Sequence, residues 1–118
     1  MTDVSYEDQQ KINKFSRLNL RMNDIEARLT ARKRAAEDYE EAGNEIMLLD
    51  DETVPFVIGE CLAHLPREDV EERLQKLQEE AEEAIRTLEA DISKIQSEMN
   101  ELKTVLYAKF GNSINLEA

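Results

Sequence analysis

This sequence is poor in the residues that make turns, cross-links and large aromatic cores. Among its 118 residues are three glycines, two prolines, one cysteine and no tryptophan, and aromatic side chains make up 5%. A sandwich or barrel built within one chain needs a turn every 8–12 residues or so, and this scarcity of glycine and proline excludes it. The single Cys61 cannot form an internal disulfide, which fits a reducing compartment.

Long apolar runs and targeting signals are also missing. No stretch approaches about 18 consecutive apolar residues, so we expect no transmembrane helix and no membrane partner. The segment 1–7 has neither a basic nor an apolar region, so we expect no secretory signal. The formal net charge of −12 would repel phosphate-rich surfaces, so we expect no nucleic-acid partner.

Apolar residues recur at alternating steps of three and four, the spacing of a coiled-coil seam. One predicted helix spans about 7–47, with Arg32 and Gly43 as irregular seam positions. Its other seam residues are Phe15, Leu18, Met22, Ile25, Leu29, Ala36, Tyr39 and Ile46. These two interruptions lie in its second half.

The second predicted helix spans about 66–110, with Pro66 in its first turn and Gly111 just past its end, followed by a tail over 111–118. Its seam residues are Val70, Leu74, Leu77, Ala81, Ile85, Leu88, Ile92, Ile95, Met99, Leu102 and Leu106. Two consecutive steps of four at Ala81 form a stutter, which locally unwinds a supercoil.

Between the helices, about 53–65 reads as a β-hairpin around Gly59-Glu60. The pairing sets Ile58 opposite Cys61, Phe56 opposite Ala63, and Val54 opposite Leu65, which makes one face wholly apolar. An isolated two-stranded hairpin is marginal in water, so its open edges call for strands from other chains.

The charge distribution favours antiparallel pairing of the two helices. Residues 1–34 carry eight basic and five acidic side chains, a net +3, whereas residues 35–118 carry seven and 22, a net −15. Folding back at the hairpin would place Arg32-Lys33-Arg34 beside Glu79, Glu80, Glu82 and Glu83. Flanking charges of this kind set partner and orientation in coiled coils.

The sequence offers little to catalysis. It has no glycine-rich phosphate loop and no metalloprotease motif, and Cys61 and His64 would point to opposite faces of a strand. The run Asp50-Asp51-Glu52 lacks the spacing and central glycine of a calcium loop. We therefore predict that the chain is not an enzyme and has no cofactor or metal site.

Apolar residues continue to the outer ends of both helices, where an antiparallel pair would have its tip. The candidates for a binding surface there are Ile12, Phe15, Leu18, Leu20, Val105, Leu106 and Phe110. The seam residues Phe15, Leu18 and Leu106 are equally interpretable as the core that closes the tip. The off-seam residues Leu20 and Val105 cannot both be buried in two helices, and exposed apolar surface marks a binding site.

Three motifs resemble the beta-type subunits of prefoldin, in particular the eukaryotic ones, over nearly the whole chain. They are Glu7-Asp8-Gln9-Gln10-Lys11-Ile12-Asn13-Lys14-Phe15, then Ile46-Met47-Leu48 with Asp50-Asp51 and the strand Pro55 to Gly59, and lastly Leu106 to Glu117. The resemblance implies one subunit over 1–118, a long antiparallel two-helix coiled coil whose hairpin completes an intersubunit β-barrel.

The resemblance also implies partners and roles. Prefoldins combine two alpha-type and four beta-type subunits, so this chain would join two alpha-type and three further beta-type chains. Docking would use the hairpin residues Val54, Phe56, Ile58, Cys61, Leu62 and Ala63. The tips would hold unfolded actin and tubulin and deliver them to the cytosolic chaperonin (CCT/TRiC) without ATP.

Other interpretations stay open at this point. A coiled-coil adaptor or tether would have a fixed partner and no affinity for unfolded chains. A helical arm of an RNA-binding enzyme should be basic, and the net −15 of residues 35–118 argues against it. We expect a cytoplasmic location and leave a nuclear role open.

Overall fold

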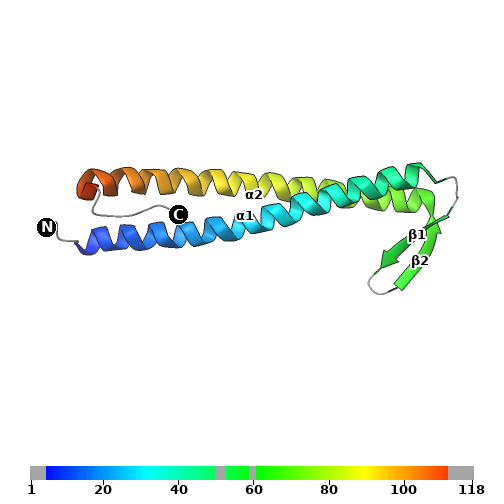
Figure 1. Cartoon of the computed structure of the whole chain (residues 1–118), viewed down its shortest axis with the longest axis horizontal. Helices are drawn as coiled ribbons and strands as arrows, with labels where there is room; N and C mark the ends of the chain where they lie inside the picture. Colours follow the sequence, from blue (N-terminus) through cyan, green and yellow to red (C-terminus); the bar gives the residue numbers. More distant parts are fainter. Residues whose placement is uncertain (1–4, 50–52, 59–60, 112–118) are drawn as a thin grey trace. The chain divides into compact units, whose positions relative to one another are not determined.

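The computed structural model describes residues 5–49, 53–58 and 61–111, with the backbone alone for 56–58 and 61–63. The element order is helix α1 (Tyr6–Met47), strand β1 (Thr53–Ile58), strand β2 (Cys61–Pro66) and helix α2 (Arg67–Phe110) (Figure 1). The predicted architecture of two long helices joined by one β-hairpin is confirmed.

The chain divides into two compact units, and both helices contribute to each. We call Met1–Leu29 together with Thr87–Ala118 the terminal unit, and Thr30–Arg86 the hairpin unit. Neither helix contains, among its described residues, an apolar stretch long enough to cross a membrane.

Helix α1 is capped at its start and tightens at its end. The Ser5 hydroxyl oxygen accepts a bond of 3.2 Å from the Asp8 backbone N–H, and the Ser5 carbonyl accepts one of 2.9 Å from Gln9. The first bond satisfies an N–H group that has no backbone partner in the first turn, and the second is the first regular bond of the helix. At the other end, the N–H groups of Leu48 and Leu49 donate to carbonyls three residues back, each at 3.1 Å, as in a 3₁₀ turn.

Helix α2 ends as expected and begins one residue later than expected. It ends at Phe110, and Gly111 adopts a φ of +60°, the left-handed conformation that glycine supplies at helix ends. Pro66 is not the first helical residue but the last residue of β2, opposite Thr53. Proline lacks an N–H, which fits a strand terminus as well as a first helical turn, so the sequence alone did not separate the two positions.

The hairpin has the predicted register. Ile58 pairs with Cys61, Phe56 with Ala63, and Val54 with Leu65, in an antiparallel two-stranded sheet. The predicted turn at residues 59–60 lies outside the described residues, as do Asp50-Asp51-Glu52.

The terminal unit is built around one continuous apolar core. Every buried residue of this core comes from a predicted seam position or from Phe110, at the end of α2. The buried members are Phe15, Met22, Ile25, Ile95, Met99, Leu106 and Phe110, and Leu18, Leu88, Ile92 and Leu102 pack against them. Burying an apolar side chain of this size stabilises the folded state by about 1.5–3 kcal/mol. This cluster therefore holds the two helices together in the terminal unit.

The hairpin unit has a smaller core where the strands meet the helices. Ile46, Val54, Val70 and Leu74 are buried, and Leu65 packs against them. Elsewhere in this unit small or charged residues interrupt the apolar seam. Ala81 is buried, Gly43 is half-buried and Arg32 is exposed. The side chains that hold this unit together are therefore fewer and smaller than those of the terminal unit.

Candidate functional site

The predicted surface residues at the helix ends separate into two groups in the terminal unit. Phe15, Leu106 and Phe110 are buried, and Leu106 has no exposed surface. Ile12 and Leu18 are half-buried and pack against the same core. In this state these side chains close the unit and offer little surface to a ligand. Their part in binding stays a prediction.

The two off-seam residues face solvent. Leu20 is 70% exposed and Val105 is 46% exposed. The expectation that two helices could not bury both is therefore met, and Tyr6 adds a third exposed side chain, at 80%. Since the core beneath is already closed, the terminal unit can present apolar groups to a ligand without unfolding.

A polar network that the sequence analysis missed links the first turn of α1 to the last turn of α2. The Asp8 carboxylate is buried, and one of its oxygens lies 2.5 Å from Lys109 Nζ. The Ser5 hydroxyl donates a bond of 2.8 Å to that same oxygen. Lys109 Nζ also lies 5.8 Å from the centroid of the Phe110 ring. The available signal was the spacing Ser5-x-x-Asp8, a capping-box pattern.

This network lowers the pKa of Asp8 below its ordinary value of 3.8. The hydrogen bond from Lys109 is the main cause, the hydrogen bond from Ser5 is the second, and desolvation opposes both. The carboxylate is therefore ionised at neutral pH and paired with Lys109 across the two helices.

Of the predicted docking residues in the hairpin, the structure describes the side chain of one. Val54 is 1% exposed and belongs to the small core of the hairpin unit. The side chains of Phe56, Ile58, Cys61, Leu62 and Ala63 lie outside the described residues. Their role in docking stays a prediction.

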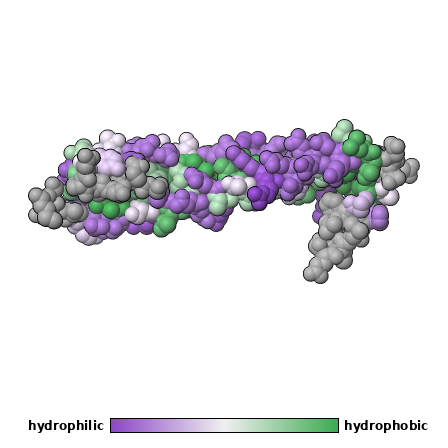
Figure 2. All heavy atoms as spheres, in the orientation of Figure 1, coloured by the Kyte–Doolittle hydropathy of each residue, from purple (hydrophilic) through white to green (hydrophobic). Residues whose placement is uncertain are grey.

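Three consecutive apolar residues at the end of α1 are exposed beside the hairpin. Met47 is 72% exposed, Leu48 84% and Leu49 38%. Figure 2 shows apolar side chains at the surface over this end of α1. Leu49 also lines a shallow groove together with Val54 and Val70. Three exposed apolar side chains in a row, next to a two-stranded sheet with open edges, are typical of a surface that a partner covers.

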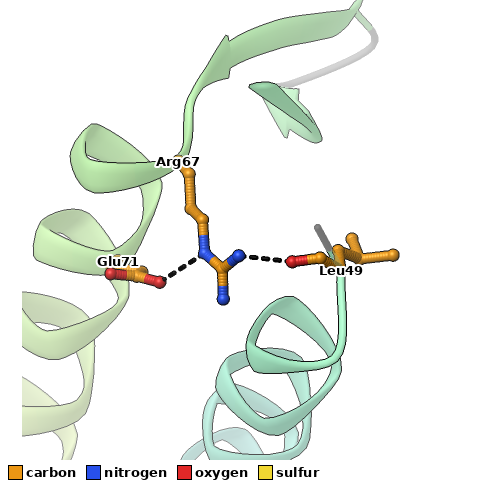
Figure 3. A network of polar contacts seen from close by, with 3 residues as sticks. All are labelled: Leu49, Arg67 and Glu71. Carbon is orange, nitrogen blue, oxygen red and sulfur yellow. Dashed lines mark hydrogen bonds and ion pairs between the residues drawn. The ribbon is translucent and has the colours of Figure 1, made fainter. Parts of the chain in front are cut away.

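Arg67 holds the end of α1 against the start of α2 (Figure 3). Its guanidinium donates to the Leu49 carbonyl and, at 2.9 Å, to the Glu71 carboxylate. The last turn of α1 has no basic residue of its own, so Arg67 supplies the positive charge that favours a helix C-terminus. Sequence reasoning missed this contact, because Arg67 lies 18 residues after Leu49.

The described residues show no arrangement for metal-assisted chemistry. In the described part of the chain, no three His, Cys, Asp or Glu side chains lie together as a metal site would require. His64 is exposed on β2. Each unit does expose apolar side chains, Leu20 and Val105 in the terminal unit and Met47 and Leu48 in the hairpin unit.

The comparisons with known proteins agree with this geometry. A family model described as "Prefoldin subunit" matches residues 9–113. This chain belongs to the prefoldin family. The match covers both helices and the hairpin, so the resemblance of the three sequence motifs to prefoldin is confirmed.

Curated relatives within the prefoldin family match over nearly the full length. Prefoldin subunit 4 of Homo sapiens is 38% identical over 118 residues, covering 98% of this chain and 88% of the relative. Prefoldin subunit 4 of Saccharomyces cerevisiae is 39% identical over 117 residues, covering 98% and 91%. The eukaryotic character seen in the terminal motifs is thereby confirmed.

A solved prefoldin structure shows the same fold. The crystal structure of the prefoldin beta subunit from Thermococcus strain KS-1 superposes with a TM-score of 0.82, covering 92% of this chain and 96% of that chain. The two sequences are 16% identical, so this likeness concerns the fold alone. It is the beta-type arrangement, with one hairpin between two helices.

Proposed function

We propose that this chain is a beta-type subunit of a hetero-hexameric prefoldin that captures unfolded or nascent proteins and delivers them to the cytosolic chaperonin. The hexamer would contain two alpha-type and three further beta-type chains besides this one. The clients would include actin and tubulin, the process would use no ATP, and it would take place in the cytoplasm. The full-length similarity to curated prefoldin subunits supports assembly with other prefoldin chains.

The observation that carries the capture step is the exposure of Leu20 and Val105 beside a closed core. A client without fixed structure offers scattered apolar side chains and no shaped pocket. Shallow contacts at several points suit such a client, and six subunits acting together would convert weak contacts into useful avidity. The chain would then bind without chemistry of its own and would be no enzyme.

The acidic residues would contribute to the same mechanism through long-range electrostatic forces. The net charge of −12 would discourage association between separate copies of the chain. It would also attract basic segments of a client at moderate ionic strength, an effect that salt screens.

The test is native affinity purification of the tagged chain from its own cells, with mass spectrometry of all proteins that co-elute stoichiometrically. The proposal expects five other small coiled-coil chains, with chaperonin subunits at lower yield. One large partner, or the chain alone, would contradict it and would favour a coiled-coil adaptor. Suppression of the aggregation of unfolded actin by the purified complex, without ATP, tests the capture step.

A further inference from the structure

The two outer edges of the hairpin differ in the hydrogen bonds that they can offer. In an antiparallel pair, residues alternate between positions whose N–H and C=O bond the neighbouring strand and positions whose groups point outward. The register leaves two residues between Ile58 and Cys61. Residues that flank a two-residue connection bond each other, so the next pair, Val57 and Leu62, points its backbone groups outward.

Counting along each strand from that pair gives the outward positions. They are Thr53, Pro55 and Val57 on β1, and Leu62, His64 and Pro66 on β2. Both prolines thus fall on outward positions. A proline at an inward position would remove a hydrogen bond between the strands, so their placement independently supports this assignment.

The prolines lie at different places on the two edges. On β1, Pro55 is the central outward residue, so the edge donors Thr53 and Val57 are separated by a position without an N–H. On β2, Pro66 is the last residue before α2, and Leu62 and His64 offer consecutive donors. A strand added to β1 would leave a carbonyl unpaired in the middle of the ladder, whereas a strand added to β2 would not.

We infer that the edge of β2 is the main strand-pairing edge of this subunit, and that it is occupied by an extended strand from a neighbouring prefoldin subunit. The inference rests on the proposed assembly and adds which edge of the hairpin a neighbouring subunit pairs with. The neighbour on the β2 side is held by backbone hydrogen bonds through Leu62 and His64. A neighbour on the β1 side can use the N–H groups of Thr53 and Val57, but the ladder is interrupted between them at Pro55.

The decisive experiment is amide hydrogen exchange, resolved to single residues, on the complex purified through this chain. The inward amides of Phe56 and Ala63 report that the hairpin is formed. The inference expects the outward amides of Leu62 and His64 to exchange at least about tenfold more slowly than those of Thr53 and Val57. Equal protection on both edges, or slower exchange at Thr53 and Val57, would overturn it.

A matched pair of variants gives a second test. His64→Pro removes the central outward N–H of β2, which β1 already lacks at Pro55. Val57→Pro removes a second outward N–H from β1. Neither variant removes a hydrogen bond between the two strands. Each variant competes with the tagged wild-type chain for incorporation into the complex. We expect incorporation of His64→Pro to fall at least about tenfold and that of Val57→Pro to change less than about threefold.

The outcomes separate this inference from the proposed function. A wild-type chain that enters no multi-subunit complex contradicts the proposed function itself. A chain that assembles, but in which Val57→Pro is as damaging as His64→Pro or more so, contradicts only the choice of edge. Circular dichroism of both variants checks that helix content is retained.

Discussion

The terminal unit and the hairpin unit are built from the same two helices, yet they differ in how much of their apolar surface they bury. The terminal unit has seven buried apolar residues, and an ion pair between Asp8 and Lys109 joins its two helices. Among the described side chains, the hairpin unit has five buried apolar residues, four of them in one cluster, and exposes three consecutive ones at the end of α1. Within the described residues, its sheet has two strands and two open edges.

This difference is consistent with the separate roles that we propose for the two units. A unit that is closed by its own side chains can present a few exposed groups, such as Leu20 and Val105, without losing its structure. A unit with a small core and open strands gains stability when a partner covers it. The predictions below test whether each unit behaves in this way, beginning with the largest expected effect.

Substitutions at two neighbouring residues of the terminal unit, one buried and one exposed, test whether its core is closed. Leu106→Ala should lower the free energy of unfolding by about 2–5 kcal/mol, because its side chain is fully buried and a cavity would remain. Val105→Ala, at a 46% exposed position on the same helix, should cost less than about 1 kcal/mol. Urea unfolding of the assembled protein, followed by circular dichroism, measures both. Similar losses for the two variants would show that the terminal core is not closed as described.

The contact of Arg67 with the end of α1 sharpens the account of the hairpin unit. Arg67→Met keeps the apolar stem and removes the guanidinium, so it should cost about 1 kcal/mol through loss of the bonds to Leu49 and Glu71. Arg28→Met is the matched control, since Arg28 pairs with Asp24 on one exposed helix face and should cost about 0.3–0.5 kcal/mol. Thermal unfolding ranks the two. A larger effect at Arg28 would remove the assigned role of Arg67.

Gly43 tests whether the weaker packing of the hairpin unit reflects its sequence. A Cβ at this position would meet nothing within 4 Å, and the residue lies inside α1. Gly43→Ala should therefore stabilise the chain by about 0.5–1 kcal/mol. Thermal unfolding provides the measurement. Destabilisation by Gly43→Ala would mean that the position is closely packed in the assembled protein.

Acid should weaken the terminal unit through Asp8. Its pKa in the folded state lies below the ordinary value of 3.8, so the ionised form stabilises the fold above that value. This stabilisation is lost as the pH falls through the lower folded pKa. We expect unfolding measurements to show a smaller loss between pH 5 and 2 for Asp8→Asn than for the wild type. Lys109→Met, which removes the main cause of the shift, should reduce the loss in the same way.

Much of the fold was predictable because it follows from regular spacing. The seam from Phe15 to Ile25 and from Ile95 to Leu106 appears in the structure as the core of the terminal unit. The hairpin register followed from a two-residue connection and alternating apolar residues such as Val54 and Phe56. Periodic patterns of this kind depend only on helix and strand geometry.

The parts that could not be predicted depend on contacts between elements. Asp8 lies one heptad before Phe15, and Lys109 lies one heptad after Leu102. Both are charged, so a seam identified by apolar residues alone does not reveal the ion pair between them. Arg67 binds a carbonyl, which any residue type at that position would supply. The division of the tip candidates into buried Phe15 and Leu106 and exposed Leu20 depends on the exact pairing of the helices.

The central claim is that the hairpin unit docks and the terminal unit binds clients, and crossing two double variants tests it most directly. Assembly is measured by native mass spectrometry, and client capture by suppression of the aggregation of unfolded actin. We predict that Phe56→Asp with Ile58→Asp abolishes assembly while helix content is kept, and that Leu20→Asp with Val105→Asp leaves assembly intact and weakens capture. If the second pair disrupts assembly, or leaves capture unchanged, the assignment of tasks to the two units is contradicted.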